Sequence, residues 1–199
     1  QLTLEPNTVF ARKPPPLPGH DLAADMQLRV EALLTEAGYE HYETSAYARP
    51  GRRCQHNLNY WGFGDYVAIG AGAHGKLTMP GGPPGAGQPA KIVRSERVKQ
   101  PRDYMQKALS ADPSRCVFER REVTRSEVGF EFMLNALRLT EGFPVAWFAE
   151  RTGYPISLVS RALDDAEREG LLVRTHETIR PTEHGQRFLN RMLEKFLPD

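Results

Sequence analysis

The sequence is poor in cysteine, has no long apolar run and carries almost no net charge. Its two cysteines, Cys54 and Cys116, allow one disulfide at most, which excludes a disulfide framework and favours a reducing cytoplasm. No segment approaches the roughly 20 apolar residues of a membrane span. The opening QLTLEPNT lacks the basic and apolar regions of a secretory signal. A net charge of +1 predicts no broad attraction to nucleic acid or membranes.

The rest of the composition is that of a globular protein. Of the 199 residues, 40% are hydrophobic and 26% are charged, which supplies enough apolar material for a core. The chain starts at Gln1, and the apolar–polar alternation of residues 1–5 begins at once. This start indicates a fragment of a longer protein, or a chain whose N-terminal half is disordered.

A strand, a helix and a second strand are predicted over the first fifty residues. Residues 1–5 alternate like a strand, and Asp21 is suited to cap a helix that Gly38 stops. The apolar residues of this helix share one face: Leu22, Met26, Val30, Leu33, Leu34 and Ala37. Residues 39–47 are predicted as the second strand. The order strand, helix, strand predicts one βα unit of a parallel sheet.

Residues 54–77, CQHNLNYWGFGDYVAIGAGAHGKL, combine clustered aromatics with several glycines. Residues 67–69 predict a short buried strand, and residues 70–73 a close-packed turn. The turn lacks the Gly-x-Gly-x-x-Gly spacing of a phosphate-binding loop, and no strong helix pattern follows it. The run of small residues fits two interpretations equally: a tight turn where backbones approach, or a surface on which a flat ligand lies.

One histidine stands beside two large rings in the segment HNLNYW. His56 is suited to bind a metal or haem iron, with Tyr60 and Trp61 lining an apolar pocket. The alternative is a hydrogen-bonded histidine beside a small aromatic core. Cys54 and His56 lack a second ligand pair at zinc-site spacing, which argues against zinc.

The middle of the chain predicts a loop, a strand and a helix. Residues 80–89, PGGPPGAGQP, predict an exposed and mobile loop. Lys91–Arg97 is predicted as a strand, and residues 101–109 as a short helix that starts with proline. Residues 117–123 are interpreted as a charged connector.

From residue 124 the pattern becomes helical. Ser126 is expected to cap the first of three helices, which end at Gly142, Gly153 and Gly170. A hairpin is predicted over residues 171–180, and Thr182 is expected to cap a closing helix. Three helices, a hairpin and a closing helix form a winged-helix pattern.

The charge of this C-terminal part argues against DNA as its ligand. Residues 124–199 contain ten basic and twelve acidic residues, a net charge of −2. The predicted third helix, which would enter the major groove, has two arginines against four carboxylates. Because this charge repels a phosphate backbone, we expect a packing or partner-docking role and no nucleic-acid binding.

Several segments occur in an order that resembles a known family. They are residues 2–8 (LTLEPNT), 42–48 (YETSAYA), 56–61 (HNLNYW), 69–75 (IGAGAHG), 138–143 (RLTEGF) and the closing winged helix. Over nearly the whole chain, the sequence resembles the C-terminal portion of the radical-SAM haem chaperone and oxygen-independent coproporphyrinogen III oxidase-like family. The His-Asn-x-x-Tyr-Trp segment is the most specific part of this resemblance.

The resemblance implies a fold of the α/β plus α class. Residues 1–122 would be the C-terminal end of a partial (β/α)6 radical-SAM barrel, with an elaboration and a mobile Pro/Gly loop near residues 80–90. Residues 123–199 would be a winged-helix-like C-terminal domain. The Cys-x-x-x-Cys-x-x-Cys ligands of the 4Fe-4S cluster and most of the S-adenosyl-L-methionine (SAM) site would lie upstream. We therefore expect this chain to hold no cluster and to perform no radical chemistry alone.

The resemblance also implies residue roles. The oxidase lacks a His-Asn-x-x-Tyr-Trp segment, so its presence favours the haem-binding branch. His56 is then the candidate ligand of haem iron, and the haem site comprises His56, Asn57, Tyr60 and Trp61. By similarity to the oxidase, backbone near Thr3, Ala73 and His74 would approach SAM. No catalytic residue is assigned.

The expected function is that of a fragment of a haem chaperone, which binds haem and delivers it to an apo-haemoprotein. The first alternative is oxygen-independent coproporphyrinogen III oxidase of porphyrin biosynthesis, and the second is a winged-helix DNA-binding regulator. The expected partner is an apo-haemoprotein in the cytoplasm. No membrane span is expected, although peripheral contact with membrane haemoproteins stays open.

Overall fold

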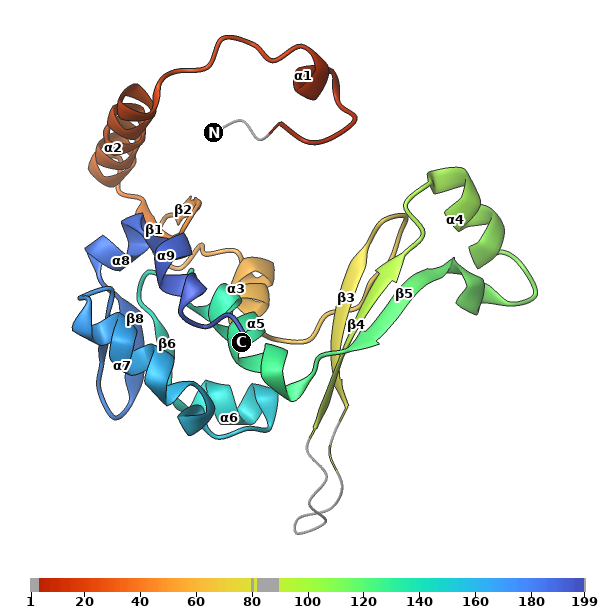
Figure 1. Cartoon of the computed structure of the whole chain (residues 1–199). Helices are drawn as coiled ribbons and strands as arrows, with labels where there is room; N and C mark the ends of the chain where they lie inside the picture. The colour runs from red at the N-terminus through yellow and green to blue at the C-terminus, as the bar shows by residue number, and fades with distance from the viewer. Residues whose placement is uncertain (1–3, 80, 82–89, 199) are drawn as a thin grey trace.

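The structure, a computed structural model, describes residues 4–79, 81 and 90–198 and shows three units along the chain (Figure 1). An N-terminal segment carries α1 (Val9–Arg12) and α2 (His20–Glu36). A helical unit follows the first strands, and a three-stranded sheet projects from it on the side away from α2. The predicted loop over residues 80–89 lies outside the described residues except at position 81.

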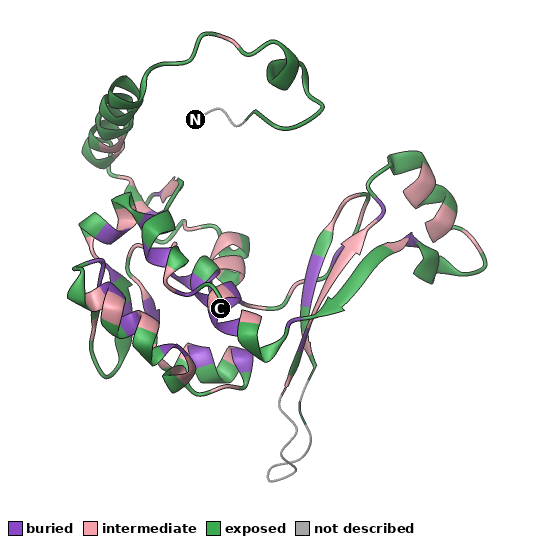
Figure 2. Cartoon of the chain, viewed as in Figure 1, coloured by how far each residue is buried: buried purple, intermediate pink, exposed green. Residues whose placement is uncertain are grey.

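Helix α2 forms as the apolar periodicity predicts, but its apolar face is exposed. Gly19 is the N-cap rather than Asp21, which lies in the first turn, and Gly38 follows the helix with φ +78°. Leu22, Met26 and Val30 keep 56%, 55% and 51% of their surface exposed. Figure 2 shows α2 almost entirely in the colour of exposed residues. No described residue buries this face.

The second strand of the predicted βα unit is wrong, and most of its first strand lies outside the described residues. Leu4 and Glu5 are not in a strand, and residues 1–3 lie outside the description. Residues 39–47 do not run as one strand, because β1 (Glu40–Glu43) and β2 (Ala46–Ala48) pair antiparallel around a turn. A residue distant in the sequence stabilises the turn, because the backbone N–H of Thr44 donates a hydrogen bond to the carbonyl of Arg138 at 3.0 Å.

Strands β3 (His74–Met79), β4 (Lys91–Arg97) and β5 (Val117–Glu122) form an antiparallel sheet in the order β3-β4-β5. The strand predicted at Lys91–Arg97 and the proline-led helix, α4 (Pro101–Ala108), are confirmed. The prediction of a charged connector over residues 117–123 is wrong, because most of these residues form β5. An edge strand exposes one side to water, so charged residues suit it.

The turn after residue 66 is less packed than predicted. Val67 and Ile69 are 66% and 82% exposed, so residues 67–69 are not a buried strand. Gly70 and Gly72 adopt φ values of +103° and +68°. A Cβ at Gly70 would meet no atom within 4 Å, and one at Gly72 would first meet Lys99 at 3.8 Å. Glycine is required there by the backbone angle and not by close approach.

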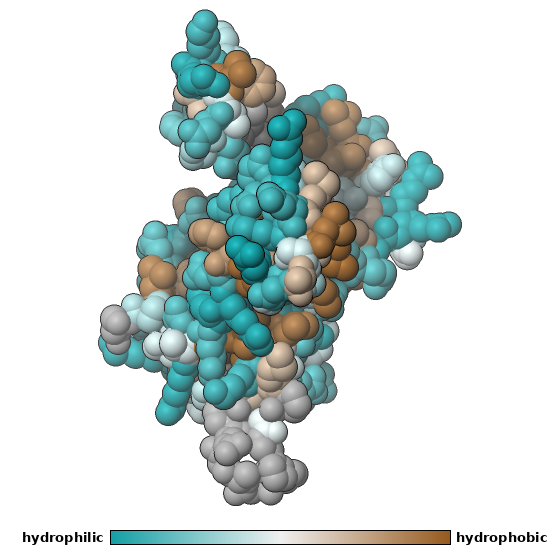
Figure 3. All heavy atoms as spheres, turned by 90° about the vertical axis from the view of Figure 1, so that its right-hand side faces the viewer, coloured by the Kyte–Doolittle hydropathy of each residue, from teal (hydrophilic) through white to brown (hydrophobic). Residues whose placement is uncertain are grey.

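Apolar side chains also remain exposed around the sheet. Met105, Leu109 and Phe118 are 53%, 87% and 67% exposed. Figure 3 views the molecule from the side to which the sheet and α4 project, and shows apolar residues among the hydrophilic surface there. These side chains contribute nothing to the core that positions the site.

The helical unit begins at α5 (Arg125–Ala136), whose N-cap is Thr124 in a capping box with Glu127, not Ser126. The other elements are β6 (Phe143–Pro144), α6 (Ala146–Thr152), the 3₁₀ helix Ile156–Val159, α7 (Ser160–Arg168), β7 (Leu172–Arg174), β8 (Thr178–Pro181), α8 (Glu183–Arg187) and α9 (Leu189–Glu194). The three strands pair antiparallel in the order β6-β8-β7. The predicted hairpin and the Thr182 cap are confirmed.

The core of this unit is centred on phenylalanine. Phe132 of α5 contacts Phe63, Phe143 and Phe148 edge-on, at ring-centroid distances of 5.5, 5.2 and 5.0 Å. Phe63 comes directly after the aromatic segment and Ile92 from the sheet, and both belong to the same buried cluster. The core therefore fixes the aromatic segment and the sheet against α5.

Candidate functional site

Helix α3 (Gln55–Trp61) carries the predicted haem segment. His56 and Tyr60 are one turn apart and lie on one side of the helix, with ring centroids 6.4 Å apart. His56 is exposed. On the neighbouring side, Asn57 Nδ2 donates to the hydroxyl of Tyr42 at 3.2 Å, and this bond fixes the helix to β1.

The rings of α3 continue into a wider aromatic surface. Tyr60 meets Trp61 edge-on at 4.7 Å and Tyr66 at 5.0 Å. The guanidinium of Arg138 lies over the Trp61 ring, with Arg138 Cζ 4.2 Å from the ring centroid. This surface offers flat apolar area with a cation at its end.

A cavity of about 740 Å³ opens beside these rings, between α3, the sheet and α5. This volume lies in the usual range of sites for small molecules and cofactors. Its aromatic and apolar lining includes Tyr60, Trp61, Tyr66, Phe130 and Leu134. Its charged lining comes from β3, β4, β5, α5 and the turn after α5, and includes His74, Arg94, Arg121, Glu131 and Arg138.

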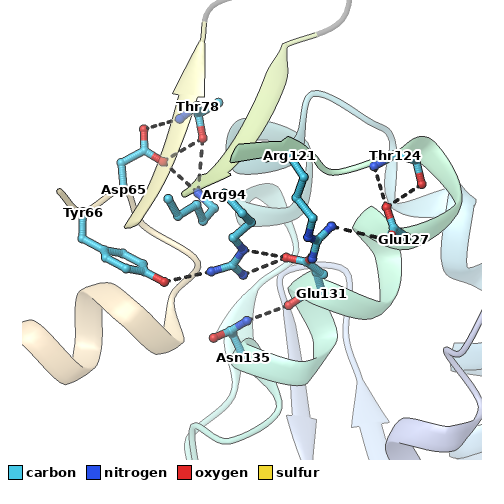
Figure 4. A network of polar contacts seen from close by, with 10 residues as sticks. Asp65, Tyr66, Thr78, Arg94, Arg121, Thr124, Glu127, Glu131 and Asn135 are labelled. Carbon is cyan, nitrogen blue, oxygen red and sulfur yellow. Dashed lines mark hydrogen bonds and ion pairs between the residues drawn. The ribbon is translucent and has the colours of Figure 1, made fainter. Parts of the chain in front are cut away.

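A buried carboxylate organises this charged wall. Glu131 of α5, only 8% exposed, accepts hydrogen bonds from Arg94 Nε at 2.9 Å and from Arg121 Nη2 at 2.7 Å. Arg94 Nη1 in turn donates to the hydroxyl of Tyr66 at 2.8 Å. Figure 4 shows these contacts joining the sheet to α5. Burial raises the pKa of Tyr66 to about 12, so its hydroxyl stays neutral at physiological pH.

A second ion pair fixes the segment after α3 to the sheet. The ammonium of Lys76, 1% exposed, lies 2.8 Å from Asp65 Oδ1 and 4.3 Å from the Phe63 ring centroid. Burial opposes ionisation of Asp65, but hydrogen bonds from Lys76 and Thr78 outweigh it and lower the pKa of this carboxyl. Burial lowers the pKa of Lys76, and Asp65 partly offsets this effect.

The structure brings together only part of the predicted site. Tyr60 and Trp61 line the cavity, whereas His56 and Asn57 of the same helix are not among its lining residues. Of the positions expected near SAM, His74 lines the cavity, Ala73 does not, and Thr3 lies outside the described residues.

The sequence patterns did not predict the charged wall. Arg94 and Arg121 are register partners on β4 and β5, and both converge on Glu131. The signal that could have found Arg121 is the row of charges in residues 117–123, which was interpreted as a connector, and Arg94 lies in the strand predicted at Lys91–Arg97. Arg138 was noted only as part of a family segment.

Neither cysteine is placed to hold a metal cluster. Cys54 is exposed, whereas Cys116 is buried with Arg97 Nη1 3.4 Å from its sulfur. Among the described residues, no group of three or more His, Cys, Asp or Glu side chains could hold a metal ion. A 4Fe-4S cluster needs thiolates that this sequence of two cysteines does not supply. The residues present therefore do not fit such a cluster.

Known proteins resemble this chain in sequence and in fold. Residues 123–188 match the family model of the HemN C-terminal domain. The fold resembles the solved structure titled "Coproporphyrinogen III oxidase (HemN) from Escherichia coli is a Radical SAM enzyme", with a TM-score of 0.60 and 14% identity over 90% of this chain and 42% of that one. At this identity the likeness shows the fold alone. The chain is thus similar to the C-terminal portion of HemN and HemW proteins.

The sequence relatives are more specific. The chain is 44% identical to Heme chaperone HemW of Escherichia coli K12 over 199 residues, which is 100% of this chain and 49% of that protein. It is 43% identical to Heme chaperone HemW of Haemophilus influenzae, over 100% of this chain and 48% of that protein. It is 29% identical to the bovine Radical S-adenosyl methionine domain-containing protein 1, mitochondrial, over 92% of this chain and 40% of that protein. The chain thus spans about half the length of the HemW relatives.

Proposed function

We propose that this chain is the haem-binding portion of a haem chaperone that delivers haem to apo-haemoproteins. The observation that carries the proposal is α3, which presents an exposed histidine one turn from a tyrosine that lines a ligand-sized cavity. The likeness to proteins named Heme chaperone HemW over the whole chain supports it.

His56 has the properties of an iron ligand in this proposal. A neutral imidazole binds haem iron, and an exposed ring needs no rearrangement to do so. The Tyr60 and Trp61 rings would shield the macrocycle from water, while Asn57 holds α3 through Tyr42. The iron would then lie at the edge of the cavity rather than in its centre, because His56 is not part of the lining.

The radical-SAM parts of the proposal come from likeness alone. A 4Fe-4S cluster and SAM would belong to the full-length protein, with backbone near Thr3, Ala73 and His74 close to SAM. The partial (β/α)6 barrel over residues 1–122 and the winged-helix domain over residues 123–199 are proposed on the same basis. The order β6-β8-β7 beside α5, α6 and α7 supports the winged helix.

The recipient and the location are also proposed. An apo-haemoprotein would receive the haem, and the cytoplasm is the proposed compartment. No helix in the described part of the chain is both long and apolar enough to cross a bilayer. The oxidase alternative has weaker support, since only the C-terminal family model and the fold favour it.

The test is haem binding followed by transfer. We expect the purified protein to bind ferric haem with a defined Soret band. It should then transfer the haem to apomyoglobin, used as a model acceptor. This transfer should be faster than haem transfer to apomyoglobin from serum albumin, which serves as the control. A protein that binds no haem, or that binds haem and converts coproporphyrinogen III instead, would refute the proposal.

A further inference from the structure

Three segments that lie far apart in the sequence meet beside α3. They are residues 42–48, 56–61 and 138–143. Glu43 of β1 forms an antiparallel bridge with Leu139. The hydroxyl of Thr140 donates to the carbonyl of His41 at 2.7 Å. The proposed haem site uses side chains of the second segment, so the other two segments have a role that it does not explain.

Arg138 connects these segments to the aromatic rings. Its guanidinium carbon lies 4.2 Å from the centroid of the Trp61 ring. Its Nη2 lies 3.4 Å from Oε2 of Glu43, whose side chain is 2% exposed, and Oε1 of Glu43 accepts from Ser45 Oγ at 3.0 Å. The Arg138 carbonyl accepts from the backbone N–H of Thr44 at 3.0 Å. Because a buried carboxylate needs its counter-ion, Glu43 keeps the guanidinium over the ring.

Packing rather than hydrogen bonding fixes the Trp61 ring. Among the described residues, its buried Nε1 has no hydrogen-bond acceptor. Arg138 lies over the ring, and Tyr60 meets it edge-on at 4.7 Å. Tyr60 in turn lies 5.0 Å from Tyr66. Without the guanidinium, the indole would lose the support of this face, and Tyr60 would lose a fixed neighbour.

Attachment of the β1–β2 hairpin does not by itself need Arg138. Arg53 donates to both carboxylate oxygens of Glu141 at 2.6 Å and to Glu40 at 3.1 Å, so it joins the same hairpin to the same distant segment. The side chains of Arg53 and Arg138 are 25% and 26% exposed. What distinguishes Arg138 is the Trp61 ring under its guanidinium. Its specific contribution is therefore to the aromatic surface.

We infer that Arg138, held by the buried Glu43, is a positioning residue that fixes Trp61, and through it Tyr60, before haem binds. This inference rests on the proposed haem-binding function and adds the pair of residues that prearranges its aromatic surface. Rings that are already ordered reduce the entropic cost of binding a flat ligand. The positioning role also accounts for the two segments that contribute no haem contact.

The test is a set of ferric haem titrations of the full protein, followed at the Soret band. Arg138→Met, which keeps an apolar stem without the charge, should weaken haem binding about fivefold, the order expected when side chains must be ordered on binding. Arg138→Lys, which keeps a cation, should lie between this variant and the parent. Arg53→Met is the matched control. It should lower the melting temperature and leave the haem affinity within about twofold of the parent.

Two further measurements separate positioning from general stability. Trp61→Leu removes the ring and should weaken haem binding, and adding Arg138→Met to it should weaken binding no further, because Arg138 acts through Trp61. Without haem, the near-ultraviolet circular dichroism of Trp61 reports how firmly its ring is held. In a Trp147→Phe background, where Trp61 is the remaining tryptophan, Arg138→Met should weaken this signal and Arg53→Met should not.

The outcomes distinguish the inference from the proposed function. If Arg138→Met keeps the parent's haem affinity or near-ultraviolet signal, or weakens binding equally with and without the Trp61 ring, the inference is wrong and haem binding stands. The same holds if Arg53→Met weakens haem binding as much as Arg138→Met does. If the parent binds no haem, the proposed function fails and the inference falls with it. If Arg138→Met does not fold, Glu43→Gln, which removes the buried anion, replaces it with the same expectations.

Discussion

Replacing Glu131 by glutamine should destabilise the junction between the sheet and α5. The carboxylate accepts from two guanidiniums, and the amide nitrogen of glutamine would face one of them as a second donor. Breaking a buried ion pair costs about 3–5 kcal/mol. Since the side chains of Arg94 and Arg121 are 22% and 44% exposed, solvent screening favours the lower end, about 3 kcal/mol. For a chain of this size the melting temperature should fall by about 6–12 °C.

The assay is thermal unfolding followed by circular dichroism, with Glu119→Gln as the matched control. Glu119 is also a glutamate of the cavity lining, but it lies exposed on β5 and should change stability by less than about 0.5 kcal/mol. The double variant Arg94→Gln/Glu131→Gln should lose less than the two single losses combined, because the pair is coupled. A Glu131→Gln protein that melts within about 2 °C of the parent would refute the reasoning.

Three further predictions concern the turn, the acid limit and nucleic acid. Gly72→Val should lower the melting temperature more than Ala71→Ser, because φ is +68° at Gly72; equal melting would show that the turn tolerates a side chain. Asp65 has a lowered pKa in the folded state, so the stability it adds is present above about pH 4 and lost as pH falls through the folded value. Urea unfolding of parent and Asp65→Asn should therefore differ at pH 7 and converge as the pH falls through the lowered pKa of Asp65, and a constant gap would contradict this. A gel shift should show only weak binding to duplex DNA, whereas sequence-selective, salt-sensitive binding would overturn the expectation.

Local signals predicted the C-terminal elements well. Gly153 is the C-cap of α6 and Gly170 follows the C-cap of α7, with φ values of +76° and +68°, where the sequence predicted stops. The stop predicted at Gly142 is wrong, because α5 ends at Ala136. Thr182 caps its helix by accepting from the N–H of Gly185. Such motifs depend on a few neighbouring residues, so the sequence alone contains them.

The errors arose where distant residues decide the structure. Residues 39–47 have the composition of one strand, but they turn because Thr44 bonds to Arg138. Periodicity predicted α2 but not a partner for its apolar face, which is exposed in the described chain. In the site, the sequence predicted the rings of Tyr60 and Trp61. It did not predict the Glu131 wall, which depends on the register of two strands and on the packing of a helix.

The most direct test of the account is a haem titration of single histidine variants in the full protein. The cavity holds a competing ligand in His74, whose side chain is 65% exposed on its lining. His176, 89% exposed in the hairpin, is the matched control. His41 is a poorer control, because its ring stacks on Tyr47 at 4.4 Å.

The account predicts that His56→Ala weakens ferric haem binding by about tenfold or more and shifts the Soret band, as loss of an iron ligand requires. His74→Ala and His176→Ala should bind haem like the parent, and all three variants should keep the parent's circular dichroism spectrum. If His56→Ala binds haem with unchanged affinity and an unchanged spectrum, His56 is a structural histidine and the central claim is contradicted.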